Sequence, residues 1–323
     1  MKSEVLVLRE EIDPLSKAWM KELRSHNRTK KSYDVNPYAE VYQFRKHVYG
    51  ILTDSADGMG APWMYLIEGE DTAMLIDTGF GIGNLKGLIR EIIGEKTLVV
   101  VNTHAHVDHC YGNFQFEKVY CHEFEAPYLE AKRNPHVWDY LFDEKGKNRW
   151  CWFDKSDIIP FKNYEIVPCP EGHRFKLGKD HEVELIFLGG HSAGHAAYLD
   201  HKERILFCGD DFLSMRVGLS GPKEGMPYGE YATIPAFLRE VEKLAGRVSE
   251  FDALFPGHFI LDIDSRAVFA MRDTLRRVVK NPEQFDYEQM NHKGIMTRLC
   301  YVNGLGTLAY NKKSAAAWKE DVE

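Results

Sequence analysis

Hydrophobic residues along this chain alternate between strand-like and helix-like spacing, and the order of the two patterns predicts an α/β fold. Short β-type runs at residues 63–68 and 72–76 are separated by three turn-forming residues, which predicts a hairpin. Apolar residues three and four positions apart between 82 and 92 then predict a helix. The β-branched run 97–101 follows, and such a run is typical of a strand buried on both faces.

The second half of the chain repeats this order of elements. Its strand-like and helix-like segments are the strands 182–188, 196–200, 204–207 and 252–255 and the helices 234–245 and 265–279. Two similar halves of this kind favour two sheets packed face to face with helices outside.

Three regions are expected along the chain. Residues 61–281 form the main domain, which includes an aromatic insert at 134–162. Residues 1–60, with a helix expected at 14–31, form an N-terminal extension that packs on the body. Residues 282–323 form a C-terminal extension, in which two β-type runs within 296–310 predict a hairpin or a subunit contact.

Composition narrows the functional classes. The 323 residues include 41 Lys and Arg against 49 Asp and Glu, so the net charge is −8 and argues against nucleic acid as a main partner. No apolar stretch is long enough to cross a membrane, and the first residues lack the apolar segment of a secretory signal. We therefore expect a cytoplasmic protein. Its six cysteines include no C-x-x-C pair, so they predict neither a disulfide framework nor a thiolate zinc site.

The densest polar cluster follows the strand at 97–101. His104, His106, Asp108 and His109 place four potential metal ligands within six residues. Side chains two apart on extended backbone point the same way, so the first two can hold one cation. The other two, where the chain turns toward a helix, can face a second cation. Imidazole and carboxylate are ligands that zinc prefers.

Further ligand-type residues follow three other predicted strands. His191 and His195 lie in the glycine-rich segment after 182–188, Asp210 follows the strand at 204–207, and His258 follows the strand at 252–255. Because α/β sites are built at the carboxyl ends of strands, we expect these residues to complete the cluster.

These motifs resemble those of the metallo-β-lactamase fold superfamily. The similarity comprises the H-x-H-x-D-H motif, the G-H-S-x-G-H motif at 190–195, Gly209-Asp210 and Pro256-Gly257-His258, and covers about residues 63–280. It implies a four-layer αββα sandwich. The metal ligands implied are His104, His106 and His191 for one cation, Asp108, His109 and His258 for the other, and Asp210 bridging both. Asp77 would orient a ligand imidazole, and His195 would lie behind the ligands.

The resemblance implies a hydrolase with two divalent metal ions, with zinc as first choice and iron or manganese as alternatives. A hydroxide bridging the two ions would attack an ester-type carbonyl, with Asp108 and Asp210 as the catalytic carboxylates. The ligand set is most similar to the lactonase and glyoxalase II branches. Because no basic cluster marks a phosphate pocket along the sequence, the first-choice substrate is a lactone, a thioester or another ester of an apolar acid.

Other functions remain open from the sequence. A phosphodiester is the rival hydrolytic substrate. A sulfur-compound dioxygenase with one iron would use His104, His191 and Asp210, and a non-catalytic binding protein would keep the fold as a scaffold.

The pocket residues are expected from two regions. Trp138, Trp150 and Trp152 of the aromatic insert are predicted to form a lid or wall over the metals, a dimer contact, or a hydrophobic cluster beneath a long loop. Phe212, Met215 and Tyr228, downstream of Asp210, would line the same cavity. The expected partner is a small, partly apolar molecule, and a homo-oligomer is left open.

Overall fold

Two β-sheets form the centre of the computed structural model, which describes residues 24, 26–53, 61–136, 139, 142–147, 153–290, 294 and 296–316. The first sheet has the strand order β1-β2-β3-β4-β5-β6-β7-β8. Its strands are β1 Lys31–Tyr33, β2 Asn36–Arg45, β3 Val48–Thr53, β4 Trp63–Glu68, β5 Thr72–Ile76, β6 Thr97–Val101, β7 Lys118–His122 and β8 Glu165–Cys169. The second sheet has the order β15-β14-β12-β11-β10-β9. Its strands are β9 Arg174–Gly178, β10 His181–Phe187, β11 Ala196–Asp200, β12 Ile205–Gly209, β14 Ala253–Pro256 and β15 Ile263–Asp264.

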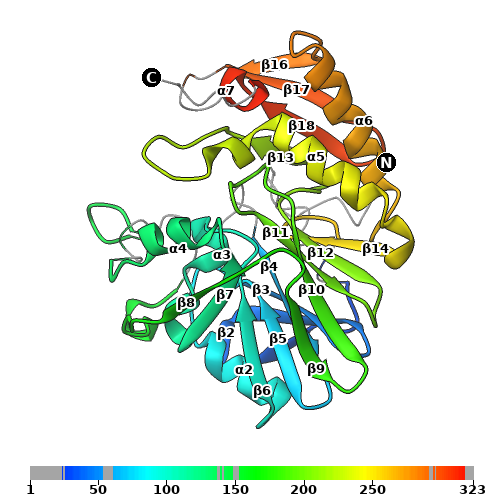
Figure 1. The fold of residues 1–323 in the computed structure, drawn as a ribbon. Helices are drawn as coiled ribbons and strands as arrows, with labels where there is room; N and C mark the ends of the chain where they lie inside the picture. Colours follow the sequence, from blue (N-terminus) through cyan, green and yellow to red (C-terminus); the bar gives the residue numbers. More distant parts are fainter. Residues whose placement is uncertain are drawn as a thin grey trace, which may run out of the picture.

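The two sheets pack against each other and are covered on their outer faces by helices (Figure 1). One core cluster joins Tyr65 and Val101 of the first sheet to Tyr198 and Phe207 of the second, so the sheets meet face to face. Helix α2 (Leu85–Ile93) covers the outer face of the first sheet. Helices α5 (Ile234–Ala245) and α6 (Ala267–Lys280) cover that of the second. The expected αββα layering is confirmed.

Short helices lie in the connections. They are α3 Val107–Cys110, η1 Asn113–Gln115, α4 Ala126–Lys132, η3 Lys155–Asp157, η4 Gly229–Ala232, η5 Val248–Glu250 and α7 Lys312–Ala315. Among the helices within the described ranges, none is both long and apolar enough to cross a bilayer.

Strand β6 differs from the expectation of burial on both faces. Thr97 is exposed, and burial increases along the strand until Val100 and Val101 are enclosed. The reason is that β6 pairs with β7 only at Val101 and Tyr120, so its first half lacks a strand on that side. The buried end is the one that leads to the histidine cluster.

The N-terminal segment contributes to the first sheet. Residues 31–53, expected to pack on the body as an extension, form β1, β2 and β3, and β3 pairs with β4 from Val48 to Leu52. The helix expected at 14–31 falls mostly outside the described residues, and Lys31 at its end lies in β1.

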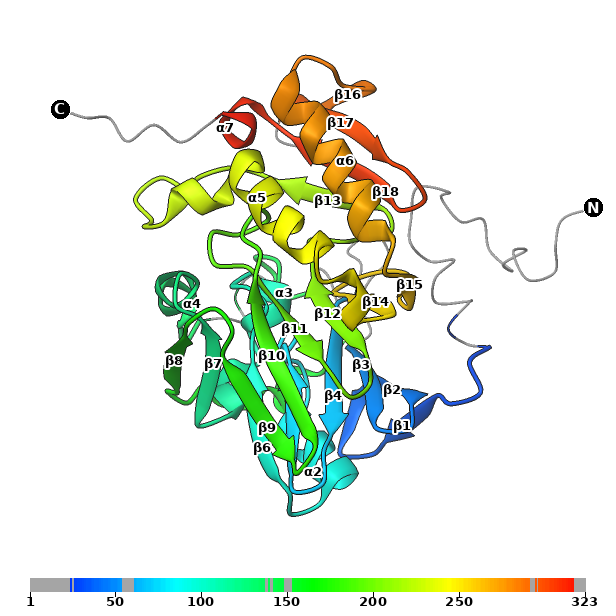
Figure 2. The ribbon, with the colours of Figure 1, turned by 45° about the vertical axis from the view of Figure 1, so that its right-hand side comes forward.

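A third sheet forms from two distant parts of the chain (Figure 2). Its order is β13-β18-β17-β16, with β13 Arg216–Leu219, β16 Tyr287–Met290, β17 Met296–Val302 and β18 Gly306–Tyr310. The runs expected within 296–310 are the β17–β18 hairpin. Strand β18 pairs in parallel with β13, so the segment after Asp210 is attached to the C-terminal part of the chain.

Candidate metal centre

Ligand-type side chains gather where strands of both sheets end. Strands β5 and β6 run parallel in the first sheet, and β12 and β14 run parallel in the second. Their carboxyl ends lead into Asp77, the 104–109 segment, Asp210 and His258, while β10 leads toward His191. Helix α3, which carries part of the motif, lies between the sheets and β13 (Figure 1).

Four residues form the first ligand cluster. His104, His106, His191 and Asp210 each offer one ligand atom within 4.8 Å of the others. The distance from His106 Nδ1 to His104 Nε2 is 3.0 Å and to His191 Nε2 2.9 Å, and His191 Nε2 lies 3.5 Å from Asp210 Oδ2. Nitrogen ligands about 2.0–2.1 Å from one tetrahedral zinc are about 3.3 Å apart, so this spacing suits a single cation.

Three residues form the second ligand cluster. Asp108 Oδ2 lies 3.2 Å from His258 Nε2, which in turn lies 3.2 Å from His109 Nε2. His109 Nε2 is 3.7 Å from the same Asp108 oxygen. One carboxylate and two imidazoles thus face a second position where a cation could bind.

Asp210 lies between the two clusters. Its Oδ1 is 3.4 Å from His109 Nε2, and its Oδ2 is 3.6 Å from His258 Nε2. Oδ1 is buried and accepts no hydrogen bond from any described residue. A buried carboxylate oxygen without a donor, facing imidazole nitrogens, is what a cation bound here would satisfy, so the donor set fits divalent metal ions.

Asp77 lies behind the two clusters and accepts hydrogen bonds from His109 and Thr103. Its Oδ2 accepts from His109 Nδ1 and from the Thr103 hydroxyl, both at 2.8 Å, and its Oδ1 accepts from the Thr103 N–H at 2.8 Å. His104 Nδ1 lies 3.0 Å from that hydroxyl. Binding each Nδ1 in this way leaves Nε2 directed at the cluster. Asp77 itself has φ 64°, a conformation that aspartate tolerates better than most residues.

His195 lies outside both clusters. Its Nδ1 is 2.7 Å from Asp211 Oδ2, and its Nε2 accepts the Asp210 N–H at 3.1 Å. The side chain therefore holds the backbone of Asp210 rather than facing the ligand atoms. Gly209 leaves the room for it, since a Cβ there would lie 2.5 Å from His195 Nε2.

Gly257 makes close packing of the ligands possible. A Cβ atom at this position would lie 2.5 Å from Asp210 Oδ1 and 2.7 Å from His109 Cε1. The neighbouring backbone is fixed by the Tyr65 hydroxyl, which donates to Pro256 O at 2.6 Å. The P-G-H segment is thus fitted against Asp210 without space for a larger residue.

Charges in the cluster set the protonation state that a cation would meet. Burial alone would raise the pKa of Asp210, but the surrounding imidazoles, His258 first, hold it below its ordinary value. Burial and the neighbouring His109 lower the pKa of His104 well below its ordinary value. Burial would also lower the pKa of His109, yet the facing carboxylates raise it to about 10. At neutral pH, Asp210 is therefore ionised, His104 is neutral, and His109 carries a proton that a cation must displace.

Glu125 connects the two ligand-bearing loops, and the sequence analysis missed it. This fully buried carboxylate accepts from the Ala105 N–H at 2.7 Å, the Gly194 N–H at 2.8 Å and the Ser192 hydroxyl at 2.6 Å. Ala105 lies between two histidines of one loop, and Ser192 and Gly194 lie between those of the other. In the sequence, a glutamate at the start of a helix looks like an ordinary helix-end residue, so nothing marked it.

A cavity of about 370 Å³ opens at the first cluster. His106 and His191 face it, and its volume lies within the usual range for small-molecule sites. The lining residues are Ala105, His106, Glu125, Tyr128, Lys132, His191, Ser192, Ala193, Ser220, Gly221, Pro222, Lys223, Ala232 and Lys313. We call it the metal-side cavity.

Of the residues expected to line the pocket, the structure describes Phe212, Met215 and Tyr228. Phe212 is fully buried in the core, where it packs against Phe237 of α5, so the expectation that it lines the cavity is wrong. Met215 and Tyr228 are each 39% exposed and are absent from the described lining of the cavity. The three tryptophans of the insert, Trp138, Trp150 and Trp152, fall outside the described residues.

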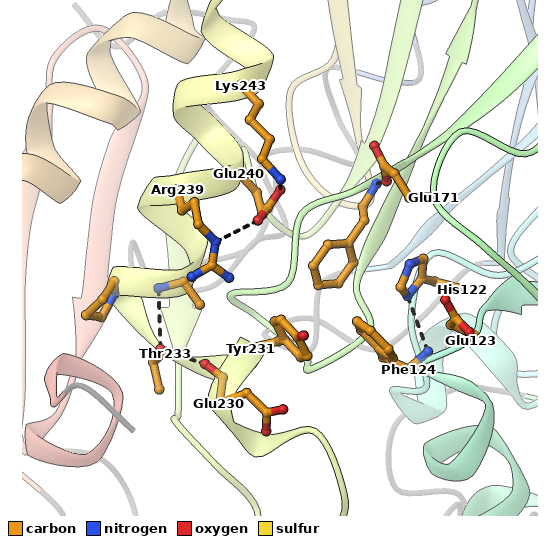
Figure 3. A pocket seen from close by; sticks show the side chains of 13 residues that line it. His122, Glu123, Phe124, Glu171, Glu230, Tyr231, Thr233, Arg239, Glu240 and Lys243 are labelled. Atoms are coloured by element: carbon orange, nitrogen blue, oxygen red, sulfur yellow. Dashed lines mark hydrogen bonds and ion pairs between the residues drawn. The ribbon is translucent and has the colours of Figure 1, made fainter. Parts of the chain in front are cut away.

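A second cavity of about 680 Å³ lies between α5 and the ends of β7 and β10 (Figure 3). His122 stacks on Phe187 with ring centroids 4.4 Å apart, and Phe124 stacks on Tyr231 at 4.6 Å. Its charged residues are Glu123, Glu171, Glu230, Arg239, Glu240 and Lys243. Neither ligand cluster includes a residue of this cavity, which we call the acidic cavity.

The fold and the site define the class of protein. The sequence model of the Metallo-beta-lactamase superfamily matches residues 57–281, and the chain belongs to this family. It is a metal-dependent hydrolase with an α/β fold.

Individual relatives fit this class. The chain is 27% identical over 210 residues to the acyl-coenzyme A thioesterase MBLAC2 of Gallus gallus, which covers 61% of this chain and 72% of the relative. The Homo sapiens protein of the same name is equally similar, with 27% identity over 211 residues and the same coverage. The hydroxyacylglutathione hydrolase GloC of Haemophilus influenzae is 25% identical over 187 residues, which cover 53% of this chain and 74% of that protein.

Solved structures share the fold. A metallo-beta-lactamase from Pontibacter korlensis aligns with TM-score 0.52 and 19% identity, covering 74% of this chain and 99% of the other. A metallo-beta-lactamase family protein from Thermus thermophilus aligns with TM-score 0.52 and 20% identity, covering 76% and 85%.

Proposed function

We propose that this protein hydrolyses thioesters of small, partly apolar acids at a centre of two divalent cations, with zinc as the first choice. His104, His106 and His191 would hold one cation, Asp108, His109 and His258 the other, and Asp210 both. The observation that carries the proposal is the position of Asp210, whose two carboxylate oxygens face both clusters within 3.6 Å of imidazole nitrogens.

Cations bound there would lower the pKa of a water molecule toward neutrality and stabilise negative charge on a carbonyl oxygen. In the overall reaction, water adds to the carbonyl carbon, the C–S bond breaks, and the departing thiolate takes up a proton. Burial alone would raise the pKa of Asp108, but the facing imidazoles, His109 first, hold it far below its ordinary value, so this carboxylate is ionised. It would take the proton that the attacking water loses and pass it to the departing thiolate, because its side chain is 24% exposed and adjoins the ligands. Asp77 and His195 keep His109 and Asp210 in place during this reaction.

Two observations support two cations and a thioester. The second cluster supplies three ligand-type side chains for a second cation, which favours a two-cation centre over the single-iron site of a dioxygenase. Thioesters are preferred among esters because two relatives are named for hydrolysis of acyl-coenzyme A, and another for hydrolysis of hydroxyacylglutathione. Tyr128, Ala193 and Pro222 give the metal-side cavity apolar surface for an acyl group.

The test removes metal from the purified chain with a chelator, reloads it separately with zinc, manganese or iron, and counts bound ions. Hydrolysis is then followed on thioesters, a lactone and bis-p-nitrophenyl phosphate. We expect two ions per chain and restored release of free thiol. A fully loaded chain that leaves every thioester intact, or that cleaves only the phosphodiester, would refute the proposal.

A further inference from the structure

Three lysines from distant segments meet at the metal-side cavity. Lys132 ends α4, Lys223 lies in the loop after β13, and Lys313 lies on α7. Each is about 90 residues from the next along the chain, so the sequence shows no basic cluster. The pairing of β18 with β13 brings the C-terminal lysine to this place.

These lysines carry uncompensated charge. None of the three forms an ion pair with any residue that the structure describes, whereas lysines such as Lys86, Lys96 and Lys243 pair with carboxylates. The carboxylate in the cavity lining, Glu125, already accepts hydrogen bonds from two backbone N–H groups and one hydroxyl, and Asp210 faces imidazoles. The cavity mouth is therefore positive in a chain whose net charge is −8.

We propose that Lys132, Lys223 and Lys313 bind the phosphate groups of the thiol carrier, so that the substrate is a thioester of a phosphorylated carrier such as coenzyme A. This inference rests on the proposed function. The acyl end enters the cavity beside His106 and His191, and the carrier lies across the mouth. Exposed ammonium groups on flexible stems suit a polyanion whose charges are spread along its length.

The acidic cavity lacks these properties. Its cations are already paired, since Arg239 Nε lies 3.0 Å from Glu240 Oε1 and Lys243 Nζ lies 2.6 Å from Glu240 Oε2 (Figure 3). Glu123, Glu171 and Glu230 add negative charge around them. The carrier phosphates therefore belong to the metal-side cavity.

The experiment compares carriers that bear the same hexanoyl group. Zinc-loaded full-length chain is assayed with hexanoyl-coenzyme A, hexanoyl-glutathione and the uncharged hexanoyl-pantetheine. The test protein is the triple variant Lys132→Ala, Lys223→Ala, Lys313→Ala. The matched control is Lys312→Ala, which removes a neighbouring exposed lysine of α7 that does not line the cavity.

We expect the triple variant to raise KM for hexanoyl-coenzyme A by about tenfold or more, because three exposed ion pairs each contribute a small factor. KM for hexanoyl-pantetheine should change less than twofold, and the control should match the wild type on both. Added salt should weaken use of the coenzyme A substrate in the wild type more than in the variant.

The outcomes separate the two proposals. If the wild type hydrolyses hexanoyl-pantetheine but the triple variant affects all carriers equally, the lysine site is refuted and thioester hydrolysis stands. If the loss is confined to hexanoyl-glutathione, the lysines bind carboxylates and the phosphate assignment is overturned. If the loaded wild type cleaves no thioester, the proposed function fails.

Discussion

The metal-side cavity and the acidic cavity share a wall. Phe124 lines the acidic cavity and the next residue, Glu125, lines the metal-side cavity. The same alternation occurs on η4, where Tyr231 faces the acidic cavity and Ala232 the other. The segments 124–125 and 231–232 therefore each contribute one residue to the acidic cavity and the next residue to the metal-side cavity.

The difference between the cavities lies in how their charges are compensated. In the acidic cavity, Glu240 pairs with both Arg239 and Lys243, and the three further glutamates of its lining leave a surplus of negative charge. In the metal-side cavity, the three lysines form no ion pair with any described residue, and beside the cavity the buried Asp210 Oδ1 lacks a donor. The larger cavity is thus negative and, among the described residues, contains no candidate metal ligand, whereas the smaller one is lined by two histidines of the first ligand cluster and by three lysines.

The largest effect is expected from His106→Ala in the metal-side cavity. Removing this ligand takes one nitrogen from the first cluster, so thioester kcat/KM should fall at least about a thousandfold and bound metal should decrease. Metal analysis and thiol release measure both. His136→Ala, an exposed histidine outside the clusters, should leave both unchanged. Wild-type activity of His106→Ala would contradict the assignment of the site.

Asp77→Asn should weaken metal binding by about 10–100-fold, since the carboxylate that orients His109 and Thr103 is lost. Competition with a coloured chelator gives the affinity. The control is Asp71→Asn, at an exposed position outside the ligand clusters. Equal affinities for the two variants would show that Asp77 does not act through the ligands.

Metal affinity should rise with pH from about 7 to about 9. The pKa of His109 is raised to about 10 in the metal-free chain, so each loaded chain releases a proton that becomes easier to remove as pH increases. The expected slope is about tenfold per pH unit, measured by chelator competition. A flat profile would mean that His109 is neutral before loading.

Glu125→Gln should lower the free energy of unfolding by about 1–3 kcal/mol, because the amide group presents a donor to backbone N–H groups that need an acceptor. Urea denaturation of the metal-free chain measures this. Glu123→Gln, on the other side of the shared wall and exposed, should change stability by less than about 0.5 kcal/mol. Equal decreases in the free energy of unfolding of the two variants would show that the hydrogen bonds of Glu125 do not contribute more to stability than an exposed glutamate does.

The smallest effect is expected in the acidic cavity. Glu240→Gln breaks pairs with two largely exposed cations, so stability should change by about 1 kcal/mol or less. Hydrolysis of every thioester should stay within twofold of the wild type. A large loss of activity would show that this cavity takes part in catalysis.

The sequence was most informative where chemistry is local or follows a strand. Four of the ligand-type residues lie within six consecutive positions, namely His104, His106, Asp108 and His109. Each of the others follows a strand that the hydrophobic pattern had predicted. The structure brings all seven expected ligand residues together. The two-half pattern likewise predicted the layers, because the inner faces of two sheets can cover each other while each outer face is covered by an apolar helix face.

What the sequence could not predict depends on how loops pack. Glu125 acts through backbone groups of two other segments, and Lys313 reaches the cavity only because β18 pairs with β13. Phe212 follows the ligand Asp210 closely, yet α5 covers it with Phe237. These contacts join residues far apart in the sequence, so the spacing of residues along the chain does not predict them.

The C-terminal part of the chain supplies one of the three lysines of the proposed carrier site. Lys313 and its short helix lie beyond the part of the chain that the family shares, 57–281, while all the ligand-type residues lie within it. Under the proposed carrier site, exchanging the C-terminal tail between related hydrolases should replace Lys313 while Lys132, Lys223 and the candidate metal ligands stay in place, so carrier preference would shift without any change at the metal centre.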